Sequence, residues 1–222
     1  MKFFASKPTR LERAHAQWVR PPGPVADGLR IGLLGGSFNP AHEGHLHVSE
    51  VALKRLGLDY VWWLVTPQNP LKARAGMASL SERVRSARAV ARHPRIIVMD
   101  IEHDFRTHYS YDTLVALQKR FPHLKFTWLM GSDNLQIFRR WHRWADLARR
   151  VPIAVIQRPG TVMAMASAKP LLRFGRTHAE RRLCGESPPA ITILEGKRNA
   201  QSATAIRAAQ RFGDAFVGAL PT

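Results

Sequence analysis

Short apolar runs alternate with helical patterns along most of this chain, and that alternation limits its fold more than any other feature. The runs at 31–34, 60–65, 96–99, 126–130, 153–156 and 191–194 have the length and composition of buried strands. Helical patterns occupy 46–56, 80–91, 111–121, 141–149, 179–183 and 202–212. Strands that alternate with helices form a parallel sheet with helices on both faces. The sequence therefore predicts a doubly wound α/β fold.

The 222 residues predict a single domain of this kind at 29–222, preceded by a basic, flexible arm at 1–28. The arm contains Pro21-Pro22-Gly23-Pro24 and shows little periodicity. The only cysteine, Cys184, excludes a disulfide within the chain and agrees with a reducing compartment. Apolar runs stay well short of the roughly 20 residues that span a bilayer. We therefore expect a cytoplasmic protein that does not enter membranes.

The chain is strongly basic, with 34 Lys and Arg residues against 16 Asp and Glu and a formal charge of +18. One interpretation is attraction to phosphorylated ligands or nucleic acid, and the other is a solvated basic surface. Because the basic residues are spread along the chain and form no blocks, the second interpretation is favoured for most of them. The basic residues beside the motifs described below remain candidates for binding a ligand.

The loop after the first predicted strand has the composition of an anion site. Gly35-Gly36-Ser37-Phe38 follow that strand, and His42 and His45 stand where the next helical pattern begins. Glycines let the backbone approach a ligand, and the N–H groups of a helix N-terminus attract phosphate. The two histidines are three residues apart, so they share one face of the first helical turn. The segment predicts a phosphate cradle beside two imidazoles, which suits transfer of a phosphate-linked group.

Polar residues also follow the second and fourth predicted strands. Lys72, after a proline-rich loop, could hold a phosphate or be an ordinary loop lysine. Gly131 permits close backbone approach, and the carboxylate of Asp133 could bind ribose or adenine or cap the next helix. Since ligands bind at the carboxyl ends of strands in such sheets, these motifs predict one shared site.

The segment 36–45, Gly-Ser-Phe-Asn-Pro-Ala-His-Glu-Gly-His, resembles the signature of the nucleotidylyltransferase superfamily. His42 to His45 match its (T/H)-x-G-H tetrad in the His form. The segment 202–207, Ser-Ala-Thr-Ala-Ile-Arg, resembles the superfamily's second phosphate motif, although Gln201 stands where isoleucine is usual. The resemblance implies a Rossmann-like doubly wound sheet of the nucleotidylyltransferase type.

The segments between these two motifs resemble the bacterial nicotinate-mononucleotide adenylyltransferases. Residues 109–114 match the form of the family's segment that lines the pyridine-nucleotide pocket, although Ser110 could also simply cap a helix. A Gly-x-Asp segment followed by Phe138 and Trp141 matches as well, and Trp141 would stack on the nicotinate ring or pack in the core. Arg158-Pro159-Gly160 stands where the family commonly has Arg-Pro-Gly.

The resemblance implies a role for each matching residue. Those implied to contact ATP and its phosphates are Gly35, Gly36, Ser37, Phe38, His42, His45, Gly131, Asp133, Ser202, Thr204 and Arg207. Those implied to contact the mononucleotide are Lys72, Tyr109, Ser110, Thr113, Trp141 and Arg158. Of these, His45 and His42 are the implied catalytic pair, with His45 stabilising charge on the α-phosphate.

The family joins ATP and nicotinate mononucleotide into deamido-NAD and pyrophosphate, a step of NAD biosynthesis. The mononucleotide phosphate, already ionised near neutral pH, attacks the α-phosphorus in line, so catalysis rests on positioning and charge neutralisation. Mg²⁺ is the expected cofactor and enters with ATP. A metal bound by the protein itself is not expected, because His42 and His45 lack a third ligand at suitable spacing.

Other functions stay open at this stage. A related transferase could use nicotinamide mononucleotide or pantetheine phosphate, the +18 charge could serve nucleic-acid binding, and a silent scaffold could keep the fold. The pyridine-pocket segments argue against pantetheine phosphate, and the ordered phosphate motifs argue against nucleic acid as an obligatory partner. Intact His42, His45, Ser202 and Arg207 argue against a silent scaffold. Acid or amide preference, a homo-oligomer and the role of the arm are left open.

Overall fold

One parallel sheet organises the structure, a computed structural model that describes residues 23–67, 77–158, 165 and 167–195. Its six strands lie in the order β3-β2-β1-β4-β5-β6, and every pair of neighbours is parallel. The strands are β1 (Arg30–Gly36), β2 (Tyr60–Val65), β3 (Ile96–Met99), β4 (Lys125–Gly131), β5 (Ile153–Ile156) and β6 (Ile191–Leu194). The predicted doubly wound α/β fold is confirmed.

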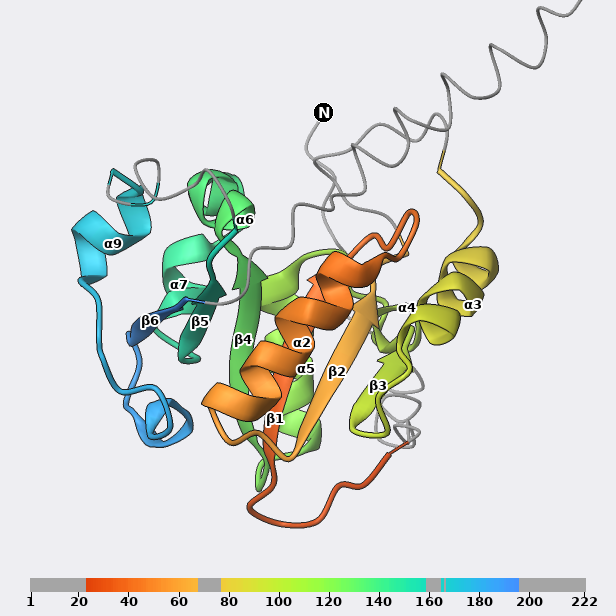
Figure 1. Cartoon of the computed structure of the whole chain (residues 1–222), viewed down its shortest axis with the longest axis horizontal. Helices are drawn as coiled ribbons and strands as arrows, with labels where there is room; N and C mark the ends of the chain where they lie inside the picture. Colours follow the sequence, from red (N-terminus) through yellow and green to blue (C-terminus); the bar gives the residue numbers. More distant parts are fainter. Residues whose placement is uncertain (1–22, 68–76, 159–164, 166, 196–222) are drawn as a thin grey trace, which may run out of the picture.

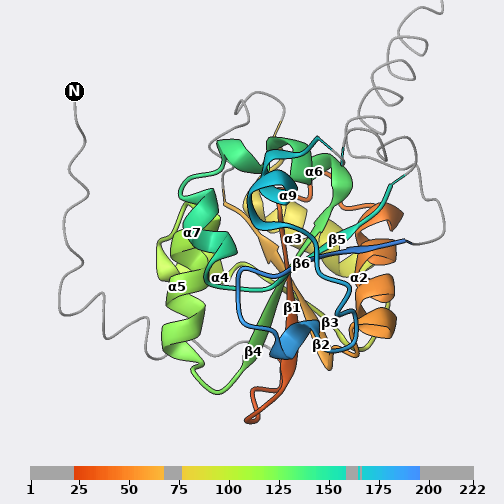
Figure 2. The ribbon, with the colours of Figure 1, turned by 90° about the vertical axis from the view of Figure 1, so that its left-hand side faces the viewer.

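Helices cover both faces of the sheet, as the alternation predicted (Figures 1 and 2). The longer ones are α2 (Glu43–Arg55), α3 (Leu80–Val90) and α5 (Ser110–Arg120). Short ones are α4 (Ile101–Phe105), α6 (Ser132–Ile137), η1 (Phe138–Arg140), α7 (Trp144–Ala148), α9 (Lys169–Phe174) and η2 (Leu183–Gly185). Figure 2 shows α2 on one side of the sheet and α5 and α7 on the other.

Each face of the sheet carries its own apolar core, because side chains along a strand point alternately to opposite faces. In β2, Trp62 packs in the core beneath α5 and α7, whereas Trp63 packs in the core beneath α2 and α3. Both tryptophans are fully buried. The two cores hold the strands in register, and this fixes where their carboxyl ends lie.

The sequence predicted four strands with the bounds that the structure gives, namely β2, β3, β5 and β6. The helix predicted at 141–149 is shorter, because Trp141 follows η1 with extended backbone and α7 begins only at Trp144. The helix predicted at 179–183 is wrong. Turns and the 3₁₀ helix η2 stand there instead.

Two predicted features fall partly or wholly outside the described residues. The helix at 202–212 does so entirely, and the arm does so up to residue 22, so the division into 1–28 and 29–222 stays a prediction. Within the described part, no helix has the length and apolar character needed to cross a membrane.

Candidate active site

The strand order reverses between β1 and β4, and the predicted site residues gather at the carboxyl ends of these two strands. Gly35 and Gly36 end β1, and Gly131 ends β4. The loop after β1 leads into α2, and β4 leads directly into α6 (Figure 1). A reversal of this kind is where open α/β sheets bind ligands.

His42 and His45 together cap the N-terminus of α2. His42 is the N-cap residue, and its Nδ1 accepts a hydrogen bond from the backbone N–H of Gly44 at 3.1 Å. His45 Nδ1 accepts one from the backbone N–H of His42 at 3.3 Å. The ring centroids lie 4.0 Å apart. With Nδ1 used as an acceptor, a neutral ring at either position carries its proton on Nε2.

Two N–H groups of the first turn of α2, where the sequence predicts a phosphate cradle, are bonded within the protein. The Gly44 N–H is bonded to His42, and the His45 N–H donates to the His42 carbonyl at 2.8 Å. Both groups are therefore already used within the helix start.

His42 is neutral at physiological pH. It is 5% exposed, and its pKa is lowered to about 4, first by burial and then by the positive charge of Arg158, while Asp133 and Glu43 act in the opposite direction. A neutral imidazole donates a hydrogen bond to a phosphate without contributing charge. The positive charge beside His42 therefore comes from Arg158.

Arg158, Asp133 and Gly131 form a tight group next to His42. Arg158 Nε lies 3.5 Å from Asp133 Oδ1, and the backbone N–H of Arg158 donates to Ser132 Oγ at 2.9 Å. The sequence assigned Asp133 to ATP and Arg158 to the mononucleotide. The structure brings the two side chains together at the carboxyl end of β4.

Gly131 leaves room for that pair. A Cβ atom at this position would lie 2.5 Å from Asp133 Oδ1 and 2.9 Å from Arg158 Nε. We expect Gly131→Ala to push both side chains aside and to lower kcat/KM by about tenfold, while the melting temperature changes little. Steady-state kinetics and thermal unfolding check this, with Gly185→Ala as the control because a Cβ there meets open space. Unchanged kinetics for Gly131→Ala would contradict the expectation.

Phe38 lies beneath the histidines and not at the surface of the site. Its φ of 46° falls in the left-handed region, which a non-glycine residue rarely adopts. The side chain is 1% exposed, stacks on Trp63 at 5.0 Å and lies 4.6 Å from the His45 ring. Phe38 therefore supports His45 from below, and only its backbone could reach ATP.

The residues matched to the pyridine pocket divide into exposed and buried ones. Tyr109 is 41% exposed and packs against His142, with ring centroids 4.4 Å apart. Trp141 is half-buried and makes edge contacts with Trp128 and Phe138. Tyr109 and Trp141 are thus placed at or near the surface. The sequence did not predict that His142 lies in this group, although its position next to Trp141 could have indicated it.

Thr113 is fully buried, so its hydroxyl points inward. That hydroxyl lies 2.8 Å from Thr107 Oγ1, 3.2 Å from the Tyr109 carbonyl and 3.3 Å from Glu102 Oε1. Ser110 is the first residue of α5 and does not cap it, because the N-cap position belongs to Tyr109. Thr113 thus holds the Tyr109 segment in place from inside.

Two buried charged side chains near the site were not foreseen. Arg83 of α3 is 2% exposed, and Glu102 of α4 is 3% exposed. The signal for Arg83 was its place beside Val84 and Ala87 on the buried face of the predicted helix. Glu102 follows β3 in the same way that Asp133 follows β4.

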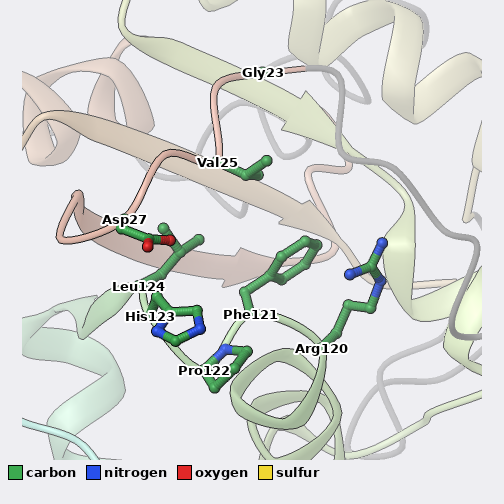
Figure 3. A pocket seen from close by; sticks show the side chains of 8 residues that line it. All are labelled: Gly23, Val25, Asp27, Arg120, Phe121, Pro122, His123 and Leu124. Carbon is green, nitrogen blue, oxygen red and sulfur yellow. The ribbon is translucent and has the colours of Figure 1, made fainter.

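Several predicted residues fall outside the described part of the chain, and one hollow lies away from this site. Lys72, Ser202, Thr204 and Arg207 fall outside the described residues. Among the described residues, no group of three or more His, Cys, Asp or Glu side chains could hold a metal ion. A hollow opens where β4 begins, at the opposite end of the strands, and is lined by Gly23, Val25, Asp27 and residues 120–124 (Figure 3).

The chain is similar in sequence and in fold to known proteins. The profile of the cytidylyltransferase-like family matches residues 33–209. A protein of Parvibaculum lavamentivorans, named a probable nicotinate-nucleotide adenylyltransferase, is 53% identical over 82% of this chain and 93% of its own. One of Methylorubrum extorquens with the same name is 49% identical over 81% and 99%. The fold is shared with the structure of Plasmodium falciparum nicotinic acid mononucleotide adenylyltransferase complexed with NaAD. The TM-score is 0.62 and the identity 15%, and the match covers 81% of this chain and 83% of that chain.

Proposed function

Because the chain belongs to the cytidylyltransferase-like family and, within it, to the nicotinate-nucleotide adenylyltransferases, we propose that its site transfers the adenylyl group of ATP to nicotinate mononucleotide. The products are deamido-NAD and pyrophosphate, in NAD biosynthesis. The observation that carries the proposal is the pair of capping histidines at the reversal between β1 and β4. Their Nε2–H groups suit the oxygens of a phosphate that gains charge during transfer.

The chemistry follows from positioned donors and does not need a strong base. The phosphate of the mononucleotide is ionised near neutral pH, so it attacks the α-phosphorus directly and pyrophosphate leaves on the far side. His45 donates to the α-phosphate, and neutral His42 orients the phosphates beside it. Arg158 supplies positive charge where the two substrates meet. Ser202, Thr204 and Arg207 are proposed to hold the leaving pyrophosphate.

Mg²⁺ is proposed to enter with ATP. An ion held by phosphate oxygens and water needs few protein ligands, which suits a site whose described residues include no metal-binding cluster. When bound, the ion would neutralise phosphate charge. The chain's own residues would orient the phosphates around it.

The pyridine nucleotide is proposed to lie over exposed Tyr109 and half-buried Ser110 and Trp141, which follow β3 and β4. Tyr109 and Trp141 offer aromatic surface for the nicotinate ring, Ser110 offers a hydroxyl, and Lys72 adds a positive charge. Thr113, being buried, positions this segment without touching the substrate. His142 joins the group through its contact with Tyr109.

Pyrophosphate release tests the function directly. The full chain is incubated with ATP and Mg²⁺, and nicotinate mononucleotide, nicotinamide mononucleotide and pantetheine phosphate are compared as acceptors. We expect strong preference for nicotinate mononucleotide. Release with another acceptor only would move the chain to a different transferase of the superfamily. Tight, salt-dependent binding of a polynucleotide without any release would favour the nucleic-acid alternative.

Trp141→Ala is expected to raise KM for the mononucleotide by about tenfold and to leave KM for ATP nearly unchanged. The reason is that a stacked indole contributes to binding of the pyridine ring alone. Trp141→Phe keeps an aromatic face and should show a much smaller increase. Initial rates with each substrate varied in turn check this. A larger effect on ATP than on the mononucleotide would place Trp141 elsewhere.

A further inference from the structure

The side chain of Arg83 is buried between two loops beside the candidate site, and its hydrogen bonds to described residues all go to backbone carbonyls. Its Nη1 donates to the carbonyl of Ser37 at 2.8 Å and to that of Thr66 at 2.7 Å. Its Nη2 donates to the carbonyl of Pro67 at 2.8 Å, and its Nε to that of Ala78 at 3.0 Å. One guanidinium thus bridges the loop after β1, the loop after β2 and the start of α3.

Among the described residues, two hydrogen bonds besides those of Arg83 lie between these segments. The Thr66 N–H donates to the Gly36 carbonyl at 2.9 Å, which is the last bond between β1 and β2. Beyond it, Asn39 Oδ1 accepts a hydrogen bond from the Ala78 N–H at 3.2 Å. The planar guanidinium of Arg83 therefore sets how the loop after β1 lies against the loop after β2.

The charge of Arg83 also lies directly behind the loop after β1, because its guanidinium binds the Ser37 carbonyl of that loop. Arginine stays protonated in proteins, and burial alone is the cause that lowers the pKa of this side chain. Its hydrogen-bond partners among the described residues are neutral carbonyls, which do not cancel the charge. In a poorly solvated environment, a positive charge attracts the phosphates of a ligand bound at the adjacent loop without touching them.

We propose that Arg83 is a positioning residue for ATP phosphates: it fixes the loop after β1 against the loop after β2 and places a buried positive charge behind it. Being 2% exposed, it does not contact substrate. The inference rests on the proposed function only in that ATP is the ligand of this loop. ATP binding is therefore measured separately from turnover, so that failure of the transfer reaction leaves the test of Arg83 intact.

The test compares Arg83→Lys and Arg83→Gly with the full wild-type chain. Arg83→Lys keeps a charge but loses the fork, and should bind ATP about tenfold more weakly by calorimetry. Arg83→Gly should bind ATP still more weakly and should recover affinity when millimolar guanidinium chloride fills the vacated space. Potassium chloride at the same concentration should not restore it. Arg88→Lys and Arg88→Gly serve as matched controls, because Arg88 is exposed on the same helix.

Two results would overturn the proposal. One is ATP affinity within error of wild type in folded Arg83→Lys. The other is guanidinium restoring the melting temperature of Arg83→Gly without restoring its affinity for ATP, which would show a structural anchor only. Should Arg83→Gly fail to fold, Arg83→Lys decides the question by itself, because its ammonium group retains the charge and part of the bonding.

Discussion

Replacing His45 by alanine is expected to lower kcat by about 10²–10³. The imidazole is held in one orientation, with Nδ1 bonded to the His42 backbone and the ring packed on Phe38. Its Nε2–H is therefore fixed before ATP arrives, and a donor fixed in advance is most effective where charge develops in the transition state. Alanine removes that donor, and water in its place would have to reorganise during the reaction. Rapid-mixing or steady-state measurement of pyrophosphate release gives kcat.

His45 also closes the capping box of α2, so a loss of activity needs to be separated from a loss of structure. His45→Gln makes this separation, because glutamine at the same helical position can return a hydrogen bond to the N-cap N–H. We expect His45→Gln to melt near wild type and yet to remain about as slow as His45→Ala. His47→Ala, two residues along the same helix, should keep normal turnover. Near-normal kcat in His45→Ala would remove His45 from the catalytic role.

The sequence predicted the turn after β1 and the start of α2 because the information is local there. Glycine and histidine at fixed spacing after an apolar run determine a turn and a helix start, whatever lies elsewhere in the chain. Strand bounds were predictable for the same reason in β2, β3, β5 and β6, whose apolar runs are fully or nearly fully buried. Each pattern of this kind depends only on residues that are close together in the sequence.

What the sequence could not predict depends on tertiary contacts. The carbonyls that bind Arg83 come from Ser37, Thr66, Pro67 and Ala78, and backbone groups carry no sequence signature. The neutrality of His42 depends on burial and on Arg158, which is distant in the chain. Even the capping role of the histidines was hidden, because histidine is not among the favoured N-cap residues. Sequence placed the reactive groups, and packing determined their charge and orientation.

Glu102 shows most clearly how packing alters a side chain. It is 3% exposed, and burial raises the pKa of its carboxyl from an ordinary 4.5 to about 7, although hydrogen bonds from Thr66 and Thr113 oppose the shift. The folded state therefore holds this proton more tightly than the unfolded state. The resulting stabilisation is complete below pH 4.5, is lost as the pH rises to about 7, and stays lost above it.

We expect this loss to amount to about 3 kcal/mol in the free energy of unfolding. His42 acts in the opposite sense, because its lowered pKa costs stability as the pH falls from 6.5 towards 4. The test therefore follows the difference between wild type and Glu102→Gln, in which the contribution of His42 cancels. Urea unfolding across this range should show wild type losing stability relative to Glu102→Gln as the pH rises. Asp104→Asn, which changes an exposed carboxylate on the same short helix, should show no such trend. A difference that does not change with pH would mean that Glu102 is already ionised in the folded protein, with its charge stabilised by the surrounding threonines.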